Sequence, residues 1–207
     1  EKALGRVANH PVQVFCAGRT DAGVHASCQV IHFDSDAHRS PRNWIHGANA
    51  NLPADISLSW VTPIGLDFHA RFSAVARRYR YVIYNDPIRP AHLAHEVTWN
   101  YRPLDIQRMR VAARALVGTH DFTSYRAVGC QAKSPIKTIH HLELLEFGRF
   151  SVLDIRANAF LHHMVRNIAG VLMQIGCGEQ PVEWAQQVLE VRDRAQGGLT
   201  APAYGLY

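Results

Sequence analysis

Short apolar runs dominate the first hundred positions and predict β-strands. Five runs are enriched in β-branched or aromatic residues and bounded by turns: 12–16, 28–33, 56–62, 68–75 and 78–84. Ser40 followed by Pro41 is typical of a helix N-cap with proline in the first turn, so a short helix through Trp44 and Ile45 interrupts the strands. This half of the chain therefore predicts a β-rich, antiparallel arrangement.

Beyond residue 104 the apolar residues recur at helical spacing. Asp105 can cap a first helix that Gly118 is available to end. Further helices are predicted over 159–175 and 181–196. Between the first two helices, two strands at 138–147 and 150–157 are separated by Gly148-Arg149, which is a hairpin signal, and a last strand is predicted at 203–207.

Strands with helices inserted, but without regular β-α-β alternation, indicate an α+β fold with antiparallel sheets. The two halves have a similar order of elements, although no internal repeat is evident in the sequence. We place the domain boundary near residues 86–104, which are rich in Pro and His. This predicts an N-terminal α+β half over 1–100 and a C-terminal α+β half over 101–207.

The composition is that of an ordinary globular protein, with 47% hydrophobic and 19% charged residues in 207. No apolar run approaches the roughly 20 residues that span a bilayer, so no membrane partner is expected. The segment 1–10 has neither an apolar secretory core nor an initiator Met, and we expect it to be the end of a helix that begins upstream. Four widely spaced cysteines without a C-x-x-C pair favour free thiols and a cytoplasmic location.

Arginine accounts for 19 of the 22 basic residues, and the formal net charge is +5. A guanidinium grips phosphate at two points and stacks on bases, so this bias favours a nucleic acid or another polyanion as partner. The 13 histidines include the adjacent pairs His140-His141 and His162-His163. Adjacent side chains point to opposite faces of a strand and lie about 100° apart on a helix, so we expect neither pair to chelate a metal ion.

Three places could carry chemistry. Asp21 lies among small residues in "AGRTDAGVHA" and is either a surface turn or a carboxylate to which a ligand backbone has access. Arg166 lies outside the apolar stripe of its helix, so it is either solvent-facing or a cation available to a carboxylate or phosphate. The strand "RRYRYVIYN" places Tyr79 and Tyr81 on one face and arginines on the other, which suits either a core strand or a stacking platform for bases.

Six stretches together resemble the tRNA pseudouridine synthase A family and occur in that family's order. They are "AGRTDAGVHA", "NANLP", "FHARFSAVARRYRYVIYN", "LVGTHDFTSYRA", "ANAFLHHMVRNI" and "GLY". The resemblance implies two related ferredoxin-like halves, with antiparallel sheets flanked by helices, around a central basic cleft. The family's opening strand, with its Tyr-Asp-Gly and Gly-Trp-Gln elements, is not present in this sequence, so we expect the first sheet to be incomplete.

The resemblance also implies an activity: the isomerisation of uridines 38, 39 and 40 in the tRNA anticodon arm, by a homodimer without a cofactor. Asp21 would be the catalytic aspartate and Arg166 the arginine that pairs with it. Arg19 would enter the RNA and help to hold the target nucleotide out, Tyr79 would pack on the uracil, and Leu206 would line the base pocket. Further candidates for tRNA contacts are Arg71, Arg77 and Arg78.

The isomerisation breaks the N1–C1′ bond, rotates the uracil and forms a C5–C1′ bond. Asp21 could add to C6 of the base, add to C1′ or remove a sugar proton, and the sequence does not distinguish these steps. Two other classes of function stay open at this point. One is an RNA-binding module without catalysis, and the other is a small-molecule hydrolase with Asp21 as its nucleophile, although no Ser elbow or His-Asp pattern accompanies it.

Overall fold

The computed structural model describes residues 1–207 and divides into two compact units. Unit 1 consists of Glu1–Arg19 and Cys28–Ala74, and unit 2 consists of Thr20–Ser27 and Val75–Tyr207. Helices and sheets together confirm the mixed α+β class. The boundary predicted near 86–104 lies inside unit 2, where residues 83–85 pair in parallel with residues 98–100.

Unit 1 is built on two helices and a short antiparallel pair of strands. Its elements are α1 (Lys2–Ala8), β1 (Phe15–Cys16), β2 (Ile31–His32) and α2 (Pro41–Asn49). The predicted cap of α2 is confirmed, since Ser40 Oγ accepts a hydrogen bond from Asn43 N at 3.2 Å. The core of the unit is small and comprises Leu4, Ala8, Val12, Trp44 and Ala48.

Two of the four strands predicted for unit 1 are wrong, and the other two are shorter than predicted. The runs 12–16 and 28–33 keep two strand residues each, and the runs 56–62 and 68–75 form none. The backbone of Leu58 forms its hydrogen bonds with a side chain and not with a neighbouring strand. Its N–H donates to Asn49 Oδ1 at 2.7 Å, and its carbonyl accepts from Asn49 Nδ2 at 3.0 Å. The apolar side chains that suggested strands, such as Trp60 and Phe72, are 57% and 75% exposed.

Unit 2 contains a five-stranded sheet in the order β4-β3-β7-β6-β5. Its strands are β3 (Arg77–Asn85), β4 (Thr98–Asn100), β5 (Gly118–Asp121), β6 (Ile136–Phe147) and β7 (Phe150–Ala157). The strands predicted at 78–84, 138–147 and 150–157 are confirmed, and so is the hairpin, in which Gly148 has a φ of +60°. Every pairing is antiparallel except that of β3 with β4.

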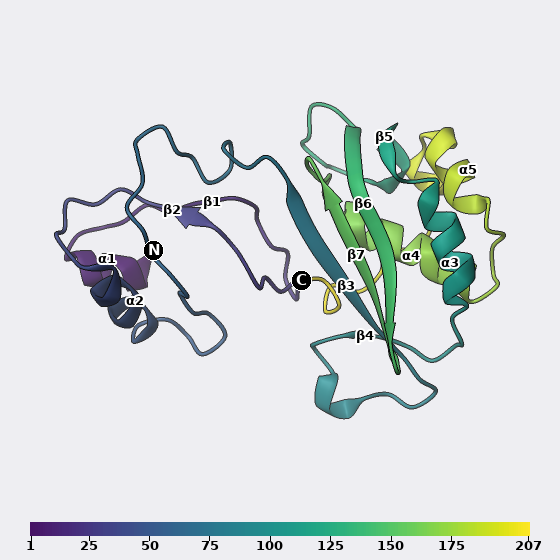
Figure 1. The fold of residues 1–207 in the computed structure, drawn as a ribbon, viewed down its shortest axis with the longest axis horizontal. Helices are drawn as coiled ribbons and strands as arrows, with labels where there is room; N and C mark the ends of the chain where they lie inside the picture. Colours follow the sequence, from purple (N-terminus) through teal and green to yellow (C-terminus); the bar gives the residue numbers. More distant parts are fainter. The chain divides into compact units, whose positions relative to one another are not determined.

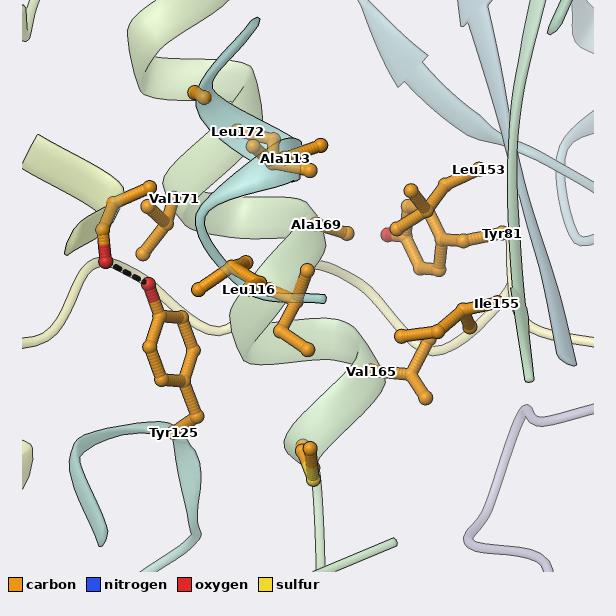
Figure 2. Close-up of a cluster of buried hydrophobic side chains, with 14 of the residues drawn as sticks. Tyr81, Ala113, Leu116, Tyr125, Leu153, Ile155, Val165, Ala169, Val171 and Leu172 are labelled. Carbon is orange, nitrogen blue, oxygen red and sulfur yellow. Dashed lines mark hydrogen bonds between the residues drawn. The ribbon is translucent and has the colours of Figure 1, made fainter. Parts of the chain in front are cut away.

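Three helices lie on one face of this sheet (Figure 1). They are α3 (Ile106–Arg114), α4 (Met164–Gly176) and α5 (Trp184–Val191). Unit 2 also contains three 3₁₀ turns: η1 (Ala91–Leu93), between β3 and β4, η2 (Thr123–Tyr125) and η3 (Arg194–Gln196). Ten of the 13 residues of α4 are buried, as expected for a helix that is packed on all sides. Figure 2 shows Val165 and Ala169 of α4 among Tyr81, Leu153 and Ile155 of the sheet.

The helix boundaries differ from the prediction at two places. The helix predicted over 159–175 begins only at Met164, because His163 has a left-handed φ of +60°. The helix predicted over 181–196 is divided into α5 and η3 by Arg192, with a φ of +51°. The predicted cap of α3 is confirmed, since Asp105 Oδ1 accepts from Arg108 N at 3.0 Å.

The last residues lie alongside β3 without forming a regular strand. Leu206 makes an isolated antiparallel bridge to Tyr81, and Tyr207 exchanges two backbone hydrogen bonds of 2.9 Å with Arg80. The segment predicted as a last strand thus adds a short strip of pairing next to the site described below. No helix in the structure is long and apolar enough to cross a membrane.

Candidate functional site

Asp21 begins a tight turn that fixes the direction of its side chain. The N–H of Val24 donates to the carbonyl of Asp21 at 3.0 Å, and Gly23 has a φ of +79°. A positive φ at the third position is what a type II turn requires. Glycine is also needed for space, because a Cβ at position 23 would lie 2.9 Å from Cε1 of Tyr204. The turn expected from the sequence is therefore present.

The segment that carries Asp21 is held against the end of the chain through His25. The His25 N–H donates to the carbonyl of Leu206 at 2.9 Å, and its ring stacks on Tyr207 with centroids 4.6 Å apart. The ring nitrogen Nε2 of His25 lies 2.8 Å from the carbonyl of His95. These contacts fix the loop within unit 2, so the position of Asp21 is set by the packing of that unit.

Two histidines meet the carboxylate of Asp21. His162 Nε2 lies 3.2 Å from Oδ1, and His163 Nε2 lies 3.1 Å from Oδ2. The two imidazole rings are 4.0 Å apart. The expectation that these side chains diverge is wrong, because His162 and His163 are in a turn before α4 and the left-handed backbone of His163 turns both rings to one side.

The protonation of His163 reflects its surroundings. Burial lowers the pKa of His163, the nearby His162 and Arg166 lower it further, and Asp21 opposes the shift. His163 is therefore uncharged at neutral pH. An uncharged imidazole with its proton on Nε2 donates a hydrogen bond to Asp21 and leaves the negative charge on the carboxylate.

Tyr79 lies at the same site, on the helix-facing side of β3. Its ring makes an edge contact with Phe160, with centroids 5.0 Å apart and planes at 88°. Burial raises the pKa of Tyr79, Arg77 opposes this shift, and the negative charge of Asp21 adds to it. The phenol of Tyr79 is therefore neutral, and it lies close enough to Asp21 for the carboxylate charge to raise its pKa.

Arg166 is near this cluster but does not bind the carboxylate. Its Nε donates to the carbonyl of Ala201 at 2.8 Å, and the Ala201 N–H returns a bond to the Arg166 carbonyl at 3.2 Å. The ion pair expected between Arg166 and Asp21 is absent, and the two histidines face the carboxylate oxygens in its place. Arg166 still influences the site electrostatically, because its positive charge lowers the pKa of His163.

Comparison with known proteins gives a consistent result. A family model described as tRNA pseudouridine synthase matches residues 1–73 and 112–207. Proteins called tRNA pseudouridine synthase A from Pseudomonas aeruginosa, Alcanivorax borkumensis and Coxiella burnetii are 71%, 63% and 58% identical to the chain over all 207 residues. The matched region is 73%, 78% and 79% of their respective lengths. The chain belongs to the tRNA pseudouridine synthase family.

The family model covers the positions of Asp21, His162, His163 and Arg166. Tyr79 lies outside the matched ranges but inside the region shared with the three relatives. The two histidines were missed as functional candidates because their positions on a turn were mistaken for positions on a helix. Their presence in the stretch "ANAFLHHMVRNI", which carries the resemblance, was the signal that could have identified them.

The remaining residues predicted for the site of this synthase lie in both units. Leu206 is 8% exposed and lies beside Tyr81, so its side chain belongs to the core of unit 2. Arg19 is an exposed residue of unit 1, where Arg71 also lies, 5.8 Å from the ring centre of Phe72. Arg77 and Arg78 are on β3, and Arg78 donates two hydrogen bonds of 2.7 Å to the buried Asp154.

Proposed function

We propose that this chain converts uridine to pseudouridine at positions 38, 39 and 40 of the tRNA anticodon stem-loop. The family assignment supports isomerisation of uridine in tRNA. The observation that carries the proposal is the carboxylate of Asp21, held by a turn and two imidazole donors beside the partly buried Tyr79. The three uridine positions come from the resemblance of the motifs.

Asp21 is the reacting group in this proposal. The isomerisation exchanges an N1–C1′ bond for a C5–C1′ bond within one nucleotide, so it needs no net oxidant, reductant or energy source. The hydrogen bonds from His162 and His163 stabilise the negative charge of the carboxylate, which is the form that can act as nucleophile or base. We therefore assign to the two histidines the supporting role that the sequence suggested for Arg166.

The remaining site residues act on the nucleotide. Tyr79 packs on the uracil, Leu206 lines the base pocket, and Arg166 contributes a positive charge near the nucleotide. Extraction of a base from its stack costs a few kcal/mol, and Arg19 offsets part of this by entering the RNA. Arg71, Arg77 and Arg78 supply further phosphate contacts.

The wider context forms part of the same proposal. We propose that the enzyme acts as a homodimer in the cytoplasm. Two related ferredoxin-like halves would surround a basic cleft that receives the anticodon arm. The arginine bias of the sequence supports a polyanionic substrate of this kind.

The test is release of the uracil C5 hydrogen from tRNA labelled at that position. We expect Asp21→Ala to reduce the rate by more than about 10³-fold, as loss of a reacting side chain does in other enzymes. Asp36→Ala is the matched control, because the Asp36 side chain is fully exposed in unit 1, and it should react at the parent rate. Activity that survives in Asp21→Ala would contradict the proposal, and salt-dependent tRNA binding by a parent protein without isomerisation would favour the RNA-binding module.

A further inference from the structure

We propose that Asp21, His162 and His163 form a binding site for a divalent transition-metal ion of the Zn²⁺ type, and that the bound ion inhibits the enzyme. The binding itself is independent of the proposed function. Only the inhibition depends on Asp21 being the reacting carboxylate.

The distances match those of a metal centre. Each of the three residues offers one ligand atom, and all three atoms lie within 4.8 Å of one another. The carboxylate oxygens are 3.2 Å from Nε2 of His162 and 3.1 Å from Nε2 of His163. Bonds of about 2.0–2.2 Å in a tetrahedral zinc site separate neighbouring ligand atoms by about 3.3–3.6 Å, so an ion fits with small movements of the side chains.

The chemistry of the donors also fits. Imidazole nitrogens and a carboxylate oxygen are common zinc ligands, and three protein ligands leave the fourth position of the ion for water. When Nε2 of each histidine binds the ion, the ring proton moves to Nδ1, and imidazole then offers the Nε2 lone pair as ligand. The side chains of Asp21, His162 and His163 are 40%, 47% and 26% exposed, so an ion has access from solvent.

Two features indicate reversible binding. In metal sites the second ring nitrogen of a ligating histidine is almost always hydrogen-bonded, and loss of that bond costs about 10–100-fold in affinity. The Nδ1 atoms of His162 and His163 have no hydrogen-bond partner in the structure. In addition, the positive charge of Arg166 acts on His163 and disfavours a cation at this place.

Occupation of the site removes the proposed nucleophile. An ion bound to a carboxylate oxygen of Asp21 withdraws electron density from the carboxylate. It also blocks the approach of the uracil base to Asp21. We therefore expect Zn²⁺ to compete with the reaction, with Asp21 as the shared group.

The first experiment measures Zn²⁺ binding by isothermal titration calorimetry. We expect one ion per chain for the parent protein, and affinity lower by at least about tenfold in Asp21→Asn, His162→Ala and His163→Asn. Asparagine at position 163 tolerates the left-handed backbone, so this variant should fold, which circular dichroism verifies. His140→Ala is the matched control, taken from an adjacent pair whose rings do not share a carboxylate, and it should bind like the parent.

The second experiment uses Co²⁺ as a spectroscopic probe. We expect the visible absorption of a tetrahedral ion with nitrogen and oxygen ligands. A strong near-ultraviolet charge-transfer band would show that a cysteine, such as Cys130 near His162, binds the ion and would overturn the proposal. Parent-like Zn²⁺ affinity in all three site variants would overturn it as well.

The inhibition is measured separately. Each protein is assayed with and without Zn²⁺, and its rate is compared with its own metal-free rate. We expect Zn²⁺ to inhibit the parent more strongly than His162→Ala, and equal inhibition of the two would refute the regulatory part. If the parent has no isomerase activity but binds Zn²⁺ as described, the proposed function fails and the metal site stands.

Discussion

Gly23 determines how Asp21 is presented. Its φ of +79° disfavours a side chain, and a Cβ there would lie 2.9 Å from the ring of Tyr204. We expect Gly23→Ala to cost about 1–3 kcal/mol of unfolding free energy and, by moving the carboxylate, to lower kcat by about 10²-fold. Thermal denaturation and the C5 hydrogen-release assay measure the two effects.

Gly178 provides a matched control for this substitution. Its φ of +76° is similar, but no atom lies within 4 Å of its added Cβ. Gly178→Ala should therefore lose about 1 kcal/mol through backbone strain alone and keep its kcat. Equal kcat values for the two variants would show that the turn does not position the reacting group.

The ion pairs of Asp154 make the folding stability of the protein depend on pH. Arg78, by hydrogen bonding, and then Arg80 hold the pKa of Asp154 below its ordinary value of 3.8, although burial opposes them. The folded state thus binds this proton more weakly than the unfolded chain, so the contribution to stability is present above about pH 3.8 and is lost as the pH falls through the lower folded-state pKa.

We therefore expect Asp154→Asn to be less stable than the parent at neutral pH, with a difference that shrinks below pH 3.8. Urea denaturation over a series of pH values measures it. Glu143→Gln is the control, since Glu143 is the cross-strand neighbour of Asp154 and is 55% exposed. A difference between Asp154→Asn and parent that stays constant down to pH 2 would contradict the assigned pKa shift.

Single residues show which parts of the site the sequence could predict. The turn at Asp21 follows from local chemistry, because Asp and Gly two positions apart favour it regardless of the rest of the fold. The meeting of His162 and His163 depends on the backbone angle of His163, which is unusual for a residue with a side chain. No periodicity rule anticipates such an angle, so the partners of the carboxylate could only be found in three dimensions.

At the level of elements, Gly170 lets the segment before the C-terminus pack on α4. A Cβ on Gly170 would overlap the carbonyl oxygen of Leu199. Gly170→Ala must therefore displace that segment, and with it Ala201, which accepts the hydrogen bond from Arg166. We expect a loss of about 1–3 kcal/mol, measured by chemical denaturation.

Gly176 of the same helix provides the comparison. Its added Cβ would meet the flexible side chain of Met109, 2.7 Å from the sulfur atom, and this side chain can move. Gly176→Ala should therefore cost less than Gly170→Ala. The reverse order would mean that the segment around Leu199 yields easily and does not hold Arg166 in place.

Elements with their own local signals were predictable. The Ser40 and Asp105 caps and the hairpin at Gly148 are correct because each is determined by a few neighbouring residues. The strands expected at 56–62 and 68–75 are wrong because a strand exists only where another backbone is available to pair with it. At Leu58 that role is taken by the side chain of Asn49, which the sequence pattern does not reveal.

For the whole molecule, order along the chain was more informative than composition. The net charge of +5 and the arginine bias favour a polyanionic partner but do not identify it. The order of the six stretches gave the family, which the comparisons confirm. The unit boundary was not predictable, because Thr20–Ser27 belongs to unit 2 although its neighbours on both sides belong to unit 1.

The two units differ greatly in the size of their cores, which leads to a prediction about unfolding. Five buried residues form the core of unit 1, against 27 in unit 2. Trp44, 7% exposed, is the largest of the five, and its truncation to alanine should cost about 3–5 kcal/mol. We expect Trp44→Ala to open unit 1 while unit 2 remains folded.

Hydrogen exchange followed by mass spectrometry measures this effect. In Trp44→Ala, amides of α1 and α2 should lose protection while those of β6, β7 and α4 keep it. Trp60→Ala is the matched control in the same unit, since Trp60 is 57% exposed, and it should leave protection unchanged. Equal loss of protection in both units would mean that they unfold as one cooperative body, and retained protection in α1 and α2 would mean that the core around Trp44 does not stabilise unit 1.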